Sequence, residues 1–203
     1  MEIIKFDLEE LKNKLNGFNC YLLGRSYDLE ENGAKEDFEK ALKYYNEGMS
    51  YGNPLCEYSI GISLMFGLGD VLEVDKEKGT RLLVDAYPRI IELINNQNLS
   101  KEERLYAKFV TGAYHYYGLG NIKKDDKKAF EIIKECADEG HIAAIYDLGA
   151  NFYYNGVGIE QDIEKAKYYL NMASEANLPR AIRKYNEYFV GAKEGEYNVT
   201  KNV

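Results

Sequence analysis

A short segment recurs four times along this chain, and the recurrence constrains the fold more than any other feature. The copies read CYLLGRSY, EYSIGISL, KFVTGAYH and YDLGANFY, and their glycines are Gly24, Gly61, Gly112 and Gly149. These glycines lie 37, 51 and 37 residues apart, and a glycine-containing turn with a second helical segment follows each copy. A helix pair of this length cannot bury its own apolar face, so neighbouring pairs must cover it. The sequence therefore predicts an all-α stack of helix pairs.

The boundaries of the repeats follow from helix-capping residues and from the glycine spacing. Asp7, with Glu10 three residues later, predicts the start of a first helix. We expect one domain over residues 1–190, in which the last segment is a capping helix. The tail 191–203 carries no pattern, and we expect it to be frayed. The predicted repeats and the capping helix are 17–52, 53–100, 101–140, 141–177 and 178–190.

The second repeat is enlarged, because the distance from Gly61 to Gly112 exceeds the regular spacing by 14 residues. Asn95–Asn98 reads as a loop, and Ser100 with Glu103 predicts that a helix begins again after it. Pro88 lies within the expected second helix of this repeat and predicts a kink or a break.

Composition narrows the classes of partner and the compartment. The formal net charge is −8, which argues against nucleic acid or an anionic membrane as the main partner. No run of about 18 apolar residues could span a membrane, and the first residues lack a signal-peptide pattern. The three cysteines form no CxxC pair, which is typical of packed thiols in a reducing compartment. We therefore expect a cytoplasmic protein.

Residues 143–177 carry a pattern that resembles the Sel-1-like repeat, a relative of the tetratricopeptide repeat. The matching positions include Ala144, Leu148, Gly149, Gly156, Gly158, Asp162, Lys165, Ala166 and Ala173. The first and third repeats match the same pattern, and the second departs most, with Gly79 where alanine is usual. The resemblance implies a right-handed α/α superhelix of about four such repeats with terminal capping helices. It also implies an adaptor or scaffold that assembles proteins.

Catalytic or metal-binding chemistry has little support in the sequence. The only histidines are His115 and His141, and neither has a second histidine or cysteine at helical spacing. No sequence pattern typical of a nucleophile, a metalloprotease or a phosphate-binding loop is present. We therefore predict a non-enzymatic protein with no cofactor and no metal site.

Helical geometry predicts where a partner would bind. Measured from each repeat glycine, positions −3, +1 and +4 lie opposite the small residues that pack the helix pair. In a right-handed stack this side lines the concave surface. We expect Ile62, Met65, Tyr116 and Tyr153 as central anchors, and Arg25 and Asp28 at the rim. The complete set of candidate binding residues is Arg25, Asp28, Tyr58, Ile62, Met65, Tyr116, Tyr146 and Tyr153.

A competing interpretation is that the aromatic residues at −3 and +5, such as Phe66 and Tyr117, pack against the neighbouring repeat. Two functions remain open. The chain could bind a partner protein or peptide in the concave groove, or it could be an acidic inhibitor or immunity-type protein that blocks a target enzyme. In either case we expect a monomer or a weak homo-oligomer.

Overall fold

A computed structural model describes residues 2–190. Every regular element in that range is helical, which confirms the predicted all-α fold. The predicted frayed tail lies outside the described residues. The elements are α1 Leu8–Asn13, α2 Gly17–Leu29, α3 Phe38–Ser50, α4 Pro54–Phe66, α5 Lys76–Asn95, α6 Lys101–Tyr117, α7 Asp126–Asp138, α8 Ile142–Asp147, η1 Leu148–Tyr153, α9 Ile163–Glu175, α10 Pro179–Tyr185 and η2 Asn186–Val190.

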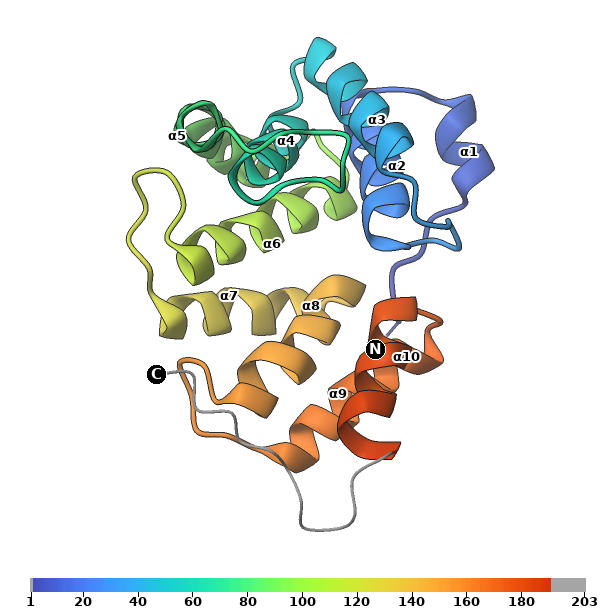
Figure 1. Cartoon of the computed structure of the whole chain (residues 1–203), viewed down its shortest axis with the longest axis vertical. Helices are drawn as coiled ribbons and strands as arrows, with labels where there is room; N and C mark the ends of the chain where they lie inside the picture. Colours follow the sequence, from blue (N-terminus) through green and yellow to red (C-terminus); the bar gives the residue numbers. More distant parts are fainter. Residues whose placement is uncertain (1, 191–203) are drawn as a thin grey trace. The chain divides into compact units, whose positions relative to one another are not determined.

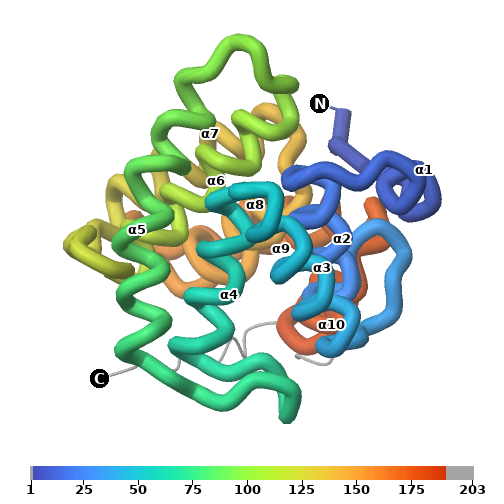
Figure 2. Tube along the Cα trace, turned by 90° about the horizontal axis from the view of Figure 1, so that it is seen from above, coloured from blue at the N-terminus to red at the C-terminus, as the bar shows by residue number. Residues whose placement is uncertain are grey.

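The chain divides into two compact units, each built from packed helices. The α1–α6 unit comprises Ile4–Asp125; α2 packs against α3, α4 packs against α5, and α6 packs against α5 (Figures 1 and 2). Among the described residues, the α7–η2 unit contains 2–3 and 126–190, where α7 packs against α8, α9 packs against η1, and α10 packs against α9. The expectation of one continuous solenoid through both units stays a prediction. Within residues 2–190, no helix is long and apolar enough to cross a membrane.

Side-chain caps explain why the helices begin where they do. The carboxylate of Asp7 accepts a hydrogen bond from the backbone N–H of Glu10 at 2.8 Å, and the hydroxyl of Ser100 accepts one from Glu103 N–H at 3.0 Å. Both predicted helix starts are therefore confirmed. The N-terminal N–H groups of a helix have no partner inside it, so such caps fix its first residue. Asp37, Asp75 and Asp162 cap α3, α5 and α9 in the same way.

The repeat glycines allow the two helices of a pair to approach closely, as the sequence predicts. A Cβ at Gly149 would lie 2.9 Å from the backbone nitrogen of Leu170 and 3.0 Å from the carbonyl oxygen of Ala166. In the second repeat the close approach is mutual, because a Cβ at Gly79 would lie 2.8 Å from the carbonyl oxygen of Gly61. This contact explains why glycine replaces the usual alanine at position 79.

Most of the 14 extra residues between Gly61 and Gly112 lengthen the two helices on either side of the loop, α5 and α6. α5 has 20 residues and α6 has 17, whereas α3, α7 and α9 each have 13. The connection between α5 and α6 lies where the sequence predicts a loop. α5 continues through Pro88, so the helix does not break there, and the alternative of a kink stays a prediction. Buried Leu83 and Ala86 before the proline and Ile90 after it keep both halves packed, which offsets the lost backbone hydrogen bond.

The lengthened α5 changes where the next turn packs. The turn after the first helix contains two glycines in the second, third and fourth repeats. In the second and fourth repeats, the second of these glycines contacts the second helix of the repeat before it, at that helix's first residue. Gly69 packs against Phe38 at the start of α3, and Gly158 packs against Asp126 at the start of α7. Gly120 instead packs against Val84, eight residues beyond the first residue of α5. At 3.6 residues per turn, the contact has moved about two helical turns along α5.

The first helix of the fourth repeat changes its hydrogen-bonding pattern midway. Residues 142–147 are α-helical as α8, and residues 148–153 continue as the π-helical η1. The sequence predicts a single α-helix over about 142–155, so this change is a correction. A π segment widens the helix locally, and it begins here beside Gly149, where the partner helix comes closest.

Candidate interaction site

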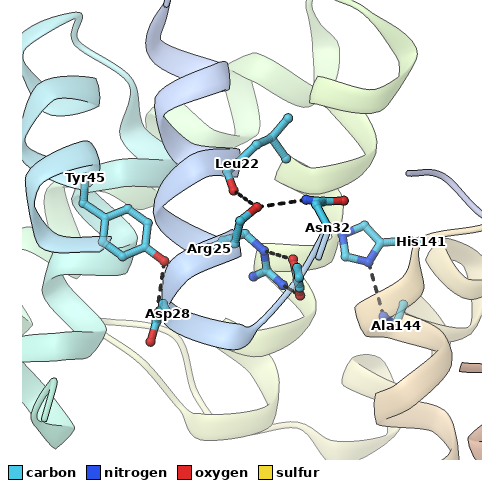
Figure 3. A network of polar contacts seen from close by, with 9 residues as sticks. Leu22, Arg25, Asp28, Asn32, Tyr45, His141 and Ala144 are labelled. Atoms are coloured by element: carbon cyan, nitrogen blue, oxygen red, sulfur yellow. Dashed lines mark hydrogen bonds and ion pairs between the residues drawn. The ribbon is translucent and has the colours of Figure 1, made fainter. Parts of the chain in front are cut away.

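Arg25 is buried, which corrects its expected place at an exposed rim. Its side chain donates to both carboxylate oxygens of Glu31, with Nε at 3.0 Å and Nη2 at 2.5 Å (Figure 3). The guanidinium also lies 5.8 Å from the ring centre of Tyr106 and 5.6 Å from that of Phe109. Only 6% of Arg25 is exposed. A charge can be buried because a carboxylate pairs with it and aromatic faces surround it.

Aromatic rings from α2 and α6 pack against one another around Arg25 in the α1–α6 unit. The ring of Tyr106 on α6 lies 6.1 Å from Tyr21 and 5.8 Å from Phe18, both on α2. Burial raises the pKa of Tyr21 to about 12. The first helices of the first and third repeats therefore touch through these rings.

Asp28 is the second residue that was expected at the rim of the groove. Its side chain is half-buried, and its carboxylate accepts a hydrogen bond of 3.1 Å from the hydroxyl of Tyr45 on α3 (Figure 3). The bond ties the two helices of the first repeat together. Asp28 thus has a structural partner, and its role in binding stays a prediction.

Two predicted binding residues of the fourth repeat, Tyr146 at position −3 and Tyr153 at position +4, contact neighbouring side chains within the α7–η2 unit. Only 7% of Tyr153 is exposed; its ring stacks on Tyr169 at 5.5 Å and meets Phe130 edge-on at 5.8 Å. Tyr146 is half-buried, with the guanidinium of Arg180 4.8 Å above its ring. Tyr153 therefore serves as a core residue of the α7–η2 unit, which argues against its use as an exposed anchor.

Tyr58 and Ile62 lie on α4 and are half-buried. The ring of Tyr58 lies 5.5 Å from that of Tyr114, and burial raises the pKa of Tyr58 well above its usual range. Tyr58 thus takes part in the packing between α4 and α6. The last turn of α4 remains the exposed part of this face.

Several large apolar side chains are exposed to solvent at the C-terminal ends of α4 and α6. Phe66 is 63% exposed, Tyr117 is 55% exposed, and their ring centres lie 6.0 Å apart. Tyr116 meets Tyr117 edge-on at 4.7 Å. Val74, also exposed, lies beside the turn at Gly67. We call the set Met65, Phe66, Val74, Tyr116 and Tyr117 the aromatic patch.

The enlarged repeat explains why the patch is open. Because the turn at Gly120 packs near the middle of α5, it leaves the first two turns of that helix uncovered. Met65 lies beside those turns, with its sulfur 3.4 Å from the hydroxyl oxygen of Thr80. Phe66, at the end of α4, therefore remains exposed next to them. The arrangement offers aromatic faces and edges for binding, and no nucleophile is paired with a base among these side chains.

The patch contains two of the predicted anchors and two aromatic residues outside the predicted binding set. Met65 and Tyr116 lie within it and are half-buried. Phe66 and Tyr117, one residue further along each helix, contact each other across the second and third repeats, as the competing interpretation expects, and they are also its most exposed members. The available signal was the 14-residue excess in the second repeat, which displaces the turn that would otherwise cover this position.

The two histidines lie at helix ends. Nδ1 of His141 accepts a hydrogen bond of 3.2 Å from the backbone N–H of Ala144 and so caps α8 (Figure 3). His115 is buried at the end of α6. Across residues 2–190, no group of three or more histidine, cysteine, aspartate or glutamate side chains could hold a metal ion.

Comparison with known proteins identifies the family. The Sel1 repeat model matches residues 20–48, 105–141 and 142–178, which is just over half of the chain, so the chain belongs to the Sel1 repeat family. Proteins of this family are generally scaffolds for protein interactions and are typically not enzymes. The second repeat, which contributes much of the aromatic patch, lies outside the matched residues.

Similar proteins come from animals and bacteria. Protein sel-1 homolog 2 of Rattus norvegicus is 36% identical over 92 residues, which cover 45% of this chain and 13% of the rat protein. A Sel1 repeat protein from Oxalobacter formigenes is 21% identical with a TM-score of 0.39, covering 89% of this chain and 47% of that one. A protective antigen of uropathogenic Escherichia coli with an SLR fold is 20% identical with a TM-score of 0.39, covering 89% of this chain and 43% of the antigen.

Proposed function

We propose that this chain is a non-enzymatic protein-interaction module that binds a partner protein or peptide through the aromatic patch. The observation that carries the proposal is the exposed pair Phe66 and Tyr117, held 6.0 Å apart by two neighbouring helix ends. Apolar side chains that gather on a surface cost solvation free energy, and such patches mark interaction sites on soluble proteins. Membership of the Sel1 repeat family supports the same class of function.

The composition of the patch suits a binding surface. Tyrosine contributes a large contact area with few rotatable bonds, and it is enriched among residues that dominate binding energy. Methionine adapts to irregular partner surfaces, so Met65 beside Phe66 can accommodate more than one side-chain shape. The expected anchor of the partner is an aliphatic or aromatic side chain that covers both rings.

Photo-crosslinking in the native host tests the proposal. A benzophenone amino acid replaces Tyr117 in one variant and Tyr168 in a matched control, since Tyr168 is 60% exposed but lies on α9 outside the patch. The expected result is a discrete protein adduct from position 117 alone, and its loss when Phe66 is also changed to alanine. Equal adducts from both positions, or an adduct that persists in the Phe66→Ala protein, would rule out the patch as the binding site.

A further inference from the structure

The segment before α1 is held against α2 and α6 by an aromatic anchor. Residues 2–7 have no regular secondary structure. The ring of Phe6 meets Phe18 at 6.3 Å and Tyr106 at 5.9 Å, both in edge-on geometry. Phe18 and Tyr106 are buried and lie 5.8 Å from each other, whereas Phe6 is half-buried and its neighbours Lys5 and Asp7 are exposed.

Asn32 adds a hydrogen bond to the main chain of this segment. Its side-chain oxygen accepts from the backbone N–H of Phe6 at 3.2 Å. Its amide nitrogen donates to the hydroxyl oxygen of Ser26 at 2.9 Å, and that hydroxyl donates to the carbonyl of Leu22 at 2.7 Å (Figure 3).

This series of bonds fixes which end of the Asn32 amide faces Phe6. The Ser26 hydroxyl uses its single proton on Leu22, so its oxygen can only accept from Asn32. The acceptor end of the amide is therefore left for a backbone N–H. Together, Phe18, Tyr106 and Asn32 form a site, the Phe6 site, for an aromatic side chain and the N–H of the same residue.

We propose that the Phe6 site is a second peptide-binding site. In the free protein the chain's own segment Ile4–Phe6 occupies the site. A partner peptide displaces this segment by placing its own phenylalanine ring and backbone N–H where those of Phe6 lie. The occupant itself defines the chemistry of the partner: one aromatic side chain between two buried rings, and one main-chain N–H on Asn32. Because α1 tethers the segment beside its site, a partner competes against a high local concentration of Phe6. The site is independent of the aromatic patch.

A labelled synthetic peptide with the sequence of residues 2–10 tests this proposal by fluorescence anisotropy. The full-length Phe6→Ala protein should bind the peptide at least about tenfold more tightly than the wild type, whose site is already filled. Replacing the peptide's phenylalanine with alanine should abolish binding. N-methylating the same residue removes the donor to Asn32 and should also weaken binding, with no change to the protein.

Three outcomes would overturn the proposal. The folded Phe6→Ala protein could fail to bind the peptide, or it could bind all three peptides equally. Binding could also disappear when Phe66→Ala and Tyr117→Ala are added to Phe6→Ala, which would place the peptide on the aromatic patch instead. Unchanged binding in that triple variant separates the two sites.

Should Phe6→Ala fail to fold, hydrogen exchange of the wild type decides the question. Excess peptide should accelerate exchange of the Phe6 amide, which loses its bond to Asn32, while the amides of α2 keep their rates. An unchanged Phe6 rate at high peptide concentration would overturn the proposal.

Discussion

The second and fourth repeats end their first helices in opposite surroundings. At the end of α4, Phe66 is exposed beside the uncovered first turns of α5. At the end of η1, Tyr153 is buried against Phe130 and Tyr169, and Tyr154 stacks on Tyr188 with ring centres 3.6 Å apart. Five residues after the repeat glycine, the side chain is thus exposed at Phe66 in one unit, whereas Tyr154 in the other is half-buried and covered by Tyr188.

The length of one helix accounts for the open end of the second repeat. The third repeat has a 13-residue second helix, α7, and the glycine of the following turn, Gly158, packs on the first residue of that helix. The second repeat has a 20-residue second helix, and the following turn packs eight residues inside it. Lengthening a helix within a stack therefore exposes side chains that regular spacing would cover, without adding a new element to the fold.

The largest expected effect separates the two positions by stability. Tyr153→Ala removes a buried ring and should lower the free energy of unfolding by about 3 kcal/mol. Tyr117→Ala removes an exposed ring and should change it by less than about 0.5 kcal/mol. Urea denaturation of both variants measures the difference. Equal losses would mean that the exposed and buried assignments do not describe the protein in solution.

Overpacking at a repeat glycine should have the next largest effect. Gly149→Leu places a side chain where Leu170 and Ala166 leave no room, and it should cost about 1–3 kcal/mol or more. Gly33→Ala is a useful comparison because nothing lies within 4 Å of a Cβ there, so any loss reflects its backbone φ of 80° rather than packing. A melting temperature of Gly149→Leu equal to that of the wild type would contradict the close helix approach.

Much of the fold could be predicted because its signals are local. Capping residues such as Asp7 and Ser100 fix helix starts through bonds to residues three positions away. Left-handed residues such as Gly52 and Gly140 mark helix ends through their own backbone angles. The glycine spacing then gives the number of repeats. None of these inferences requires knowledge of which residues meet across the stack.

The site could be predicted only in part because it depends on contacts between repeats. A helical wheel places Arg25 on the inner face, but Glu31 and the aromatic rings on α2 and α6 that bury it become neighbours only after folding. The wheel also treats position +4 alike in every repeat, although Met65 is half-buried and Tyr153 is buried. The shifted turn at Gly120 causes that difference, and its consequence for exposure appears only in three dimensions.

Thiol labelling gives a further comparison of the two units. Burial raises the pKa of Cys20 to about 11 and raises that of Cys56 as well, and Cys136 is buried in α7. All three thiols should therefore resist an aromatic disulfide reagent at pH 8 until the protein opens. Tyr153→Ala should speed the labelling of Cys136, whereas Tyr117→Ala should leave Cys20 and Cys56 unchanged. Rapid labelling of the native wild type would contradict the packing of these helices.

The smallest expected effect concerns the cap of α9. Hydrogen bonds from the backbone N–H and then the side chain of Lys165 hold the pKa of Asp162 below its usual range. The charged cap therefore adds stability above the unfolded-state pKa of about 3.9, and this stability is lost as pH falls through the lower folded-state pKa. Asp162→Asn keeps a capping oxygen without the charge, so it should be less stable than the wild type at pH 7. A difference that persists at pH 2 would assign the effect to something other than charge.

The affinity of the crosslinked partner for patch variants measures whether the aromatic patch is the binding surface. Isothermal titration compares the wild type with the Phe66→Ala/Tyr117→Ala double variant and with Tyr168→Ala, which removes an equally exposed ring outside the patch. For the double variant we expect a loss of about 2 kcal/mol, or roughly 30-fold in Kd, with unchanged helical content, and for Tyr168→Ala we expect no change. Wild-type affinity in a folded double variant would contradict this expectation.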